Sequence, residues 1–288
     1  DMTYFNKPFN TEEQPIEKDR YRLLWSALCP YAHRAVIARE LLGLDNVISL
    51  GTLDYRRGED GWQFSLDPDG VDPILKKSTI KSVYNYSEPN YEGPYSVPAL
   101  VDLKTERIVR KESAEILHEF ATVFKPLHKE GAIDLYPESL EKQIDEWNEK
   151  LAIAVNDGVY GMGFAKTQDE YDLAFNRFFD SLDEVEERLS NQRYINGNSI
   201  TETDIRFYTT MIRFDVVYYG MYGANKKRIE DYPNIFNYLK DLYQTPGFGD
   251  TTDFEAIKVG YYLSRGRGIV PGGPSVDKWQ EPHDRLRF

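Results

Sequence analysis

The sequence predicts an α+β protein in which a domain with a small mixed sheet precedes an all-helical domain. The first half alternates short apolar segments with helical patterns, in the order strand, helix, strand, strand, strand, helix. The second half has helical periodicity over 138–158, 169–190, 203–219 and 233–245. Because Lys125-Pro126 and Tyr136-Pro137 separate these patterns, we expect domains over 20–126 and 127–288.

The first elements predict a parallel pair of strands joined by a crossover helix. Residues 1–19 read as an irregular arm, and Tyr21–Trp25 reads as a buried strand. Apolar residues recur at helical spacing over 30–43, and Asn46–Leu50 is a second apolar run. This alternation predicts a parallel β-α-β unit.

The segment from about 54 to 94 lacks periodicity and is rich in Gly, Pro, Asp, Tyr and Asn. It is long for a loop in a compact domain, so we expect a functional insertion. Trp62 stands out within it. Its indole either pins the loop to the domain or lines a ligand site, and composition favours neither.

The remaining elements of the first domain surround a proline. Apolar residues flank Pro98 in 96–102, which predicts a turn, with a cis bond as one way to form it. A short strand at Ile108-Val109 and a helix with Ser113 as its N-cap follow. The serine at this helix start is either an ordinary cap or a carboxylate-binding group.

One helix start in the second half has a specific signature. Thr201 and Asp204 form a capping box, and Ile200 and Ile205 a hydrophobic staple. Residues 249–288 are Gly- and Pro-rich and predict a long C-terminal tail.

Composition limits the partners and the compartment. The net charge of -13 argues against nucleic acid and anionic membranes as partners. A single cysteine excludes an intramolecular disulfide and indicates a reducing compartment. No apolar run reaches the ~20 residues of a membrane span, and the N-terminus lacks a signal-peptide core. We therefore expect a cytoplasmic protein, and the four histidines lie in no metal-ligand spacing.

Cys29 is the candidate reactive group. It lies between a predicted strand and Pro30, which suits the first position of a helix. The unpaired N–H groups of a helix N-terminus favour an anion and therefore the reactive thiolate. A lone cysteine is more often a small buried hydrophobe, but its place between strand, proline and helix favours a reactive thiol.

Several segments in the same order resemble the glutathione transferase fold, a thioredoxin-like domain followed by a helical domain. The resemblance is greater to its Xi class, the glutathionyl-hydroquinone reductases, and covers nearly the whole chain. The segments that carry it are Cys29-Pro30-Tyr31-Ala32-His33-Arg34, Gly61-Trp62-Gln63-Phe64, Ser96-Val97-Pro98, Glu112-Ser113-Ala114-Glu115-Ile116, 201–206, 213–218, 254–261 and Glu281-Pro282-His283.

The resemblance implies an activity and a set of site residues. Cys29 would attack the sulfur of a glutathionyl-hydroquinone, and a second glutathione would resolve the mixed disulfide. Glutathione would be bound by Trp62, the Val97 backbone, Glu112 and Ser113. The quinol would be bound by Tyr160, Tyr218 and Tyr261, and its carbon protonated with their help. The resemblance also implies a homodimer. We interpret His33 and Arg34 of the motif as structural residues.

Three departures from the family pattern leave alternatives open. Members commonly carry an arginine shortly before Val-Pro that helps to hold glutathione, and this chain has Gly93-Pro94-Tyr95 in that region. Gly161 replaces a lysine, and 221–224 replace a basic segment. These changes are compatible with an Omega-like thiol transferase or deglutathionylase that uses another low-molecular-weight thiol. A third possibility is a non-catalytic protein that binds aromatic ligands.

Overall fold

The computed structural model describes residues 4–288, so the first three residues of the predicted arm lie outside the described residues. The described chain forms two compact units. The first unit extends to Ile133 and also includes Glu255–Gly268. The second unit comprises Asp134–Phe254 and Ile269–Phe288. The predicted boundary at 126/127 therefore lies close to Ile133, where the chain first passes from one unit to the other. The segment Glu255–Gly268 later returns to the first unit.

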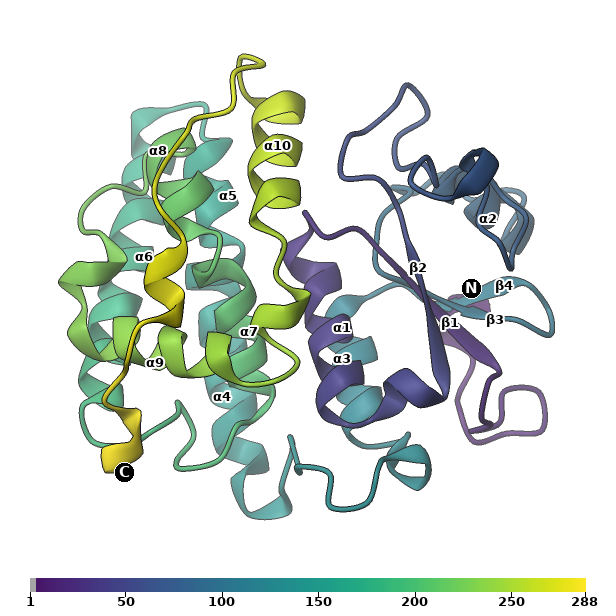
Figure 1. Ribbon diagram of the computed structural model, residues 1–288, viewed down its shortest axis with the longest axis horizontal. Coiled ribbons are helices and arrows are strands. Elements are labelled where there is room, and N and C mark those ends of the chain that lie inside the picture. Colours follow the sequence, from purple (N-terminus) through teal and green to yellow (C-terminus); the bar gives the residue numbers. More distant parts are fainter. Residues whose placement is uncertain (1–3) are drawn as a thin grey trace. The chain divides into compact units, whose positions relative to one another are not determined.

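The first unit contains the predicted mixed sheet (Figure 1). Its strands are β1 (Tyr21–Trp25), β2 (Ile48–Thr52), β3 (Ala99–Asp102) and β4 (Arg107–Arg110), in the order β2-β1-β3-β4. β1 runs parallel to β2 and antiparallel to β3, and β3 runs antiparallel to β4. All five residues of β1 are buried, as expected for a central strand covered on both faces.

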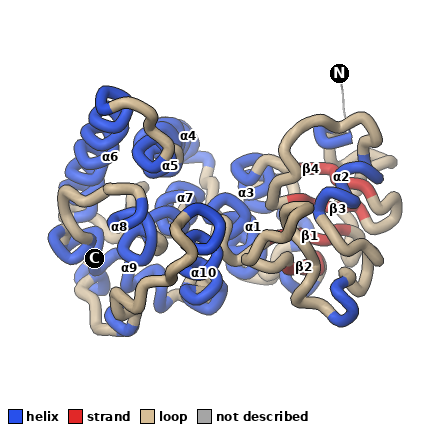
Figure 2. Tube along the Cα trace, turned by 90° about the horizontal axis from the view of Figure 1, so that it is seen from above, coloured by secondary structure: helices blue, strands red, loops and turns tan. Residues whose placement is uncertain are grey.

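Helices cover both faces of this sheet (Figures 1 and 2). α1 (Pro30–Leu41) and α3 (Ser113–Ala121) pack together on one face, and α2 (Ile80–Ser87) lies on the other. Two buried ion pairs tie β1 to its surroundings, because Arg20 bonds Asp102 and Arg22 bonds Asp72. Such pairs are costly to break by removing one partner, so they fix the position of β1.

Two boundaries in this unit differ from the sequence prediction. The second strand begins at Ile48 and not at Asn46, because Gly43 takes a φ of 70° and Leu44–Asn46 forms a 3-10 turn. The segment over 54–94 is not irregular throughout, because it contains α2. The buried residues of α2 recur at helical spacing, but the helix is short and contains several Tyr, Asn and Ser residues. For this reason the sequence pattern did not predict it.

The predicted tail over 249–288 was wrong in its first part, where α10 (Phe254–Arg265) forms. A Cβ at Gly260 would lie only 3.0 Å from Leu28 Cδ2 and from the carbonyl oxygen of Tyr55. α10 therefore packs directly on the segments that flank β1 and β2, and a larger residue at position 260 would require its neighbours to shift.

The second unit is helical, as predicted, around a core in which Phe178 stacks on Phe214 with ring centres 5.7 Å apart. Two of the predicted helices are interrupted by π-helical turns, at Ala152–Asn156 and at Phe214–Tyr218. Such turns recur at functional sites in proteins. The helices are α4 (Glu141–Leu151), α5 (Gly158–Gly163), α6 (Gln168–Leu189), α7 (Glu202–Met211), α8 (Tyr219–Met221) and α9 (Pro233–Gln244).

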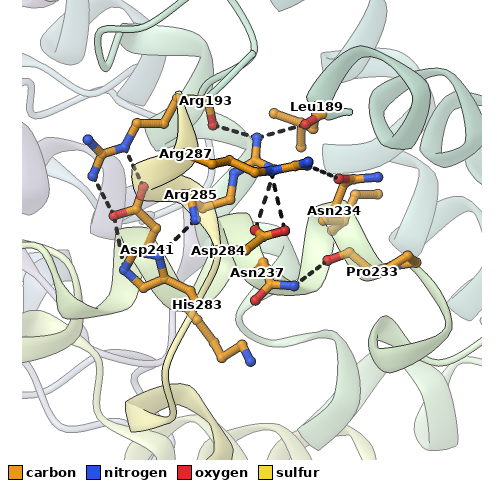
Figure 3. Close-up of polar contacts among 12 residues, drawn as sticks. Leu189, Arg193, Pro233, Asn234, Asn237, Asp241, His283, Asp284, Arg285 and Arg287 are labelled. Atoms are coloured by element: carbon orange, nitrogen blue, oxygen red, sulfur yellow. Dashed lines mark hydrogen bonds and ion pairs between the residues drawn. The ribbon is translucent and has the colours of Figure 1, made fainter. Parts of the chain in front are cut away.

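The last residues of the chain are anchored to the second unit by Arg285 (Figure 3). The Arg285 side chain is fully buried, and its Nη2 donates to the carbonyl oxygens of Leu189, Gln192 and Arg193. These carbonyls lie at and just beyond the end of α6, where backbone acceptors have no helical partner and a cation is favoured. Beside it, Arg193 forms a bidentate pair with Asp241.

No helix among residues 4–288 is long and apolar enough to cross a membrane.

Candidate functional site

The Cys29 thiol lies at the N-terminus of α1, as predicted. Cys29 is the N-cap residue, and its Sγ accepts a hydrogen bond from the backbone N–H of Ala32, with S and N 3.4 Å apart. Pro30 occupies the first helical turn, where a backbone N–H has no acceptor within the helix, so its absence costs no hydrogen bond. The thiol is partly exposed. It is therefore both oriented by the helix and accessible to a reactant.

The Val97–Pro98 peptide faces this thiol. The bond between Val97 and Pro98 is cis, as the sequence allowed. The Cys29 thiol points at the Val97 carbonyl oxygen, with S and O 3.8 Å apart. The backbone before β3 thus lies directly beside the sulfur, where a bound peptide could pair with it.

The predicted γ-glutamyl site lies at the start of α3. Ser113 was predicted as the N-cap, and this was wrong: Glu112 is extended with φ −89° and ψ 119°, and Ser113 is the first helical residue. The Glu112 side chain is exposed and pairs with Lys111 Nζ at 2.6 Å. Arg34 Nη1 lies 3.4 Å from Ser113 Oγ, which connects α1 to this helix start. Sequence reasoning gave Arg34 a purely structural role and missed this contact.

Trp62 forms part of the same unit and borders a cavity. Its side chain is buried, and the Arg57 guanidinium covers its ring, with Cζ 4.2 Å from the ring centre. Arg57, Trp62, Lys81 and Ser96 contribute to the lining of a cavity of about 370 Å³. Sequence reasoning missed Arg57. A cation five residues before a loop tryptophan is the signal that could have found it.

The three predicted quinol tyrosines come from both units. Tyr261 lies on α10 in the first unit and is buried. Tyr160 on α5 and Tyr218 in the second π-helical turn lie together in the second unit, with their hydroxyl oxygens 3.5 Å apart. Two phenols at this spacing can share a hydrogen bond and relay a proton.

Tyr222 adds a further ring to this pair and was missed by the sequence analysis. Its ring stacks on Tyr218 at 5.5 Å between centres and lies 5.9 Å from Tyr160. Phe164 completes the aromatic cluster and is 53% exposed. With 21 tyrosines in the chain, composition alone could not single out Tyr222.

Across the part of the chain that the structure describes, no group of three or more His, Cys, Asp or Glu side chains is placed to hold a metal ion.

Both units match known domain families. Residues 28–123 match the glutathione S-transferase N-terminal domain, and residues 168–241 match the C-terminal domain. The chain belongs to the glutathione S-transferase family. The predicted glutathione transferase fold, with its thioredoxin-like first domain, is confirmed.

The similarity extends to particular members of that family. The chain is 41% identical to glutathionyl-hydroquinone reductase of Escherichia coli, over 94% of this chain and 84% of the relative. It is 40% identical to the glutathione S-transferase omega-like 2 of Schizosaccharomyces pombe, over 90% and 86%. The crystal structure of the glutathione S-transferase Xi from Phanerochaete chrysosporium matches with a TM-score of 0.91 and 39% identity, covering 98% of each chain. The predicted resemblance to Xi-class enzymes is confirmed.

Proposed function

We propose that this protein reduces glutathionyl-hydroquinones with glutathione as the second substrate. The observation that carries the proposal is the Cys29 thiol, which caps α1 and lies beside the cis Val97–Pro98 peptide. The E. coli relative named as such a reductase supports the substrate class.

The first half-reaction breaks the bond between the glutathione sulfur and the quinol carbon. The Cys29 thiolate attacks that sulfur and forms a disulfide with it. The electron pair of the broken bond goes to the quinol carbon, which takes a proton and leaves as hydroquinone. The conjugate carbon is thereby reduced, while the two sulfurs are oxidised to the disulfide level.

The second half-reaction restores the enzyme. A second glutathione attacks the glutathionyl sulfur of the mixed disulfide, and Cys29 leaves as the thiolate. Oxidised glutathione is the product. An external thiol is required because the chain has one cysteine.

The first unit provides the groups that we assign to glutathione. The Val97 backbone would pair with the cysteinyl residue, and Trp62 would close the site beside it. The first turn of α3 offers unpaired N–H groups and the Ser113 hydroxyl to the γ-glutamyl carboxylate. The exposed Glu112 carboxylate would bind the γ-glutamyl ammonium in exchange for Lys111.

Tyrosine hydroxyls provide the groups that we assign to the quinol. Tyr160, Tyr218 and Tyr261 would donate hydrogen bonds to the quinol oxygens and supply the proton to the leaving carbon. The contact between the Tyr160 and Tyr218 hydroxyls supports a shared role for these two.

The proposal is tested by intact mass after incubation with a glutathionyl-hydroquinone and no free thiol. We expect Cys29 to gain one glutathionyl group while free hydroquinone appears. A Cys29→Ser variant is the control and should show neither change. Wild-type protein that stays unmodified while Cys29 remains open to alkylation would overturn the proposal.

A second candidate is a broader thiol transferase, supported by the relatives named omega-like glutathione S-transferases. The discriminating experiment compares kcat/KM for a glutathionyl-hydroquinone with that for a simple glutathionyl mixed disulfide. Preference for the hydroquinone conjugate supports the reductase, and equal rates support the transferase.

We further propose that the protein is a cytoplasmic homodimer. The single cysteine supports a reducing compartment. Light scattering after size-exclusion chromatography tests the dimer, for which the 33.5 kDa chain should elute with twice its mass. A species of one chain mass at micromolar concentration would overturn it.

A further inference from the structure

Arg57 presents a cation that contacts an aromatic ring but has no anionic partner in an ion pair among the described residues. Its guanidinium lies over Trp62, and among residues 4–288 it has no hydrogen bond or ion pair. The adjacent Arg56 differs, because its Nε and Nη2 bond the Asp54 carboxylate at 3.1 and 3.2 Å. A guanidinium has five N–H donors in a planar fork that matches a carboxylate. Arg57 is therefore available for an anionic ligand, and the Trp62 ring orients it.

The cavity beside Arg57 borders the backbone that we assign to the cysteinyl residue of glutathione. Ser96 lines it and immediately precedes Val97. On another wall, Lys81 Nζ lies 3.5 Å from Asp60 Oδ1, so these two charges offset each other. Glu59 also lines the cavity, and its side chain is exposed, as is that of Arg57. Among the described residues that line the cavity, Arg57 is thus the cation without an ion pair.

The sulfur and the guanidinium influence each other. The pKa of Arg57 is lowered, first by burial and then by Arg265, while the charge of Cys29 raises it. A guanidinium remains protonated under all these influences. Arg57 is therefore a permanent positive charge within electrostatic range of the reactive sulfur.

Glutathione has three parts, and the proposed site so far accounts for two of them. We assign the γ-glutamyl end to Ser113 and the cysteinyl residue to Val97. The glycyl residue is attached to the opposite end of the cysteinyl residue, so its carboxylate must lie on the side of Val97 away from Ser113. The cavity shares no lining residue with α3 and borders Ser96. It is the place where this second carboxylate can be received.

We propose that Arg57 binds the glycyl carboxylate of glutathione and supplies a cation that the segment Gly93-Pro94-Tyr95 lacks. This inference rests on the proposed glutathione-dependent function. It assigns the specificity for a tripeptide thiol to a residue of the loop before Trp62, in a different part of the sequence from the usual arginine.

The test compares glutathione with γ-glutamylcysteine, which lacks only the glycyl residue. Binding is measured by calorimetry on a Cys29→Ser background, so that no turnover intervenes. A charge-assisted bidentate bond predicts that glutathione binds about tenfold more tightly than γ-glutamylcysteine. With Arg57→Ala in the same background, the two thiols should bind equally. With Arg56→Ala, which removes the same charge one residue away, the tenfold preference should remain.

Three results would overturn the inference: no preference in the parent, a preference that survives Arg57→Ala, or no binding of either thiol. Arg57→Gln is the second variant, since it keeps most of the side chain over Trp62 if the alanine variant unfolds. The outcome is separate from that of the proposed function. A preference lost with Arg57→Ala supports Arg57 even if wild-type protein releases no hydroquinone.

Discussion

The sulfur of Cys29 and the backbone nitrogen of Ala32 lie 3.4 Å apart, so the thiol caps the helix on which its own reactivity depends. Serine can make the same cap with its hydroxyl, whereas alanine cannot. The two substitutions therefore separate the structural role of Cys29 from the chemical one.

We expect Cys29→Ala to be about 1 kcal/mol less stable than Cys29→Ser, because alanine leaves the Ala32 N–H without its partner. Both should lose at least about a thousandfold in reductase rate, since neither forms a disulfide. Urea unfolding and steady-state assays of the two variants measure these effects. Equal stabilities of the two variants would show that a hydroxyl at position 29 does not cap α1, which would contradict the prediction.

A second prediction concerns the Tyr160–Tyr218 pair. Tyr218→Phe removes one hydroxyl from the pair while keeping the stacked ring, and we expect kcat for the quinol conjugate to fall about a hundredfold. Resolution of a preformed Cys29–glutathione disulfide by free glutathione should be unaffected, because no quinol takes part. Tyr136→Phe is the control, since the Tyr136 hydroxyl bonds Asp145 elsewhere in the same unit. Slower resolution in Tyr218→Phe would contradict the assigned role.

A third prediction follows from the buried capping residue of α7. Burial raises the pKa of Asp204 to about 6, although bonds from Thr201, Tyr238 and Ile195 favour its charged form. Between about pH 4 and 6 the folded state therefore holds the proton more tightly than the unfolded chain. The contribution of Asp204 to stability must fall as the pH rises through this window and stay constant above it.

Asp204→Asn has no such titration, so the difference in unfolding free energy between wild type and variant should be larger at pH 4 than at pH 7. The change should be about 3 kcal/mol at most. Urea unfolding at both pH values measures this change. Other carboxylates change the stability of wild type and variant equally, so their contribution cancels in the difference. A difference that shrinks on acidification would mean that the pKa of Asp204 is lowered.

A fourth prediction concerns the anchor of the C-terminal residues. Arg285→Met fills the buried space but leaves the carbonyls after α6 without donors, which should cost about 2–3 kcal/mol. Arg287→Met removes a half-exposed cation two residues away and should cost less than about 0.5 kcal/mol. Thermal unfolding compares the two, and protease cleavage after Arg265 or Arg267 should become faster only in Arg285→Met. Equal cleavage rates would show that Arg285 does not hold the tail.

Local sequence signals predicted the local geometry around Cys29. The apolar run of β1, Cys29 and Pro30 fix the start of α1 within one short segment, and the helix terminus follows from the same residues. The turn at Pro98, for which a cis bond was one option, and the cap at Thr201 are also local features. These predictions needed no knowledge of the tertiary structure.

Contacts between distant segments could not be predicted in this way. Arg57 is one of 35 Lys and Arg residues, and only its place over Trp62 distinguishes it. Likewise, Gly260 reads as one more glycine before a Gly-rich tail, and only the structure shows its close approach to Leu28. Such contacts depend on the sheet order and on the path of the loops, which hydrophobic periodicity does not encode.

The return of α10 to the first unit affects how the chain folds as it is made. The first unit lacks the helix that covers Leu28 until Gly260 has left the ribosome, by which time the whole of α4 to α9 has emerged. The N-terminal half of a nascent chain therefore cannot complete its own packing before the C-terminal half exists. A fragment that ends at Ile133 would likewise expose the apolar surface that α10 covers, and would be prone to aggregate.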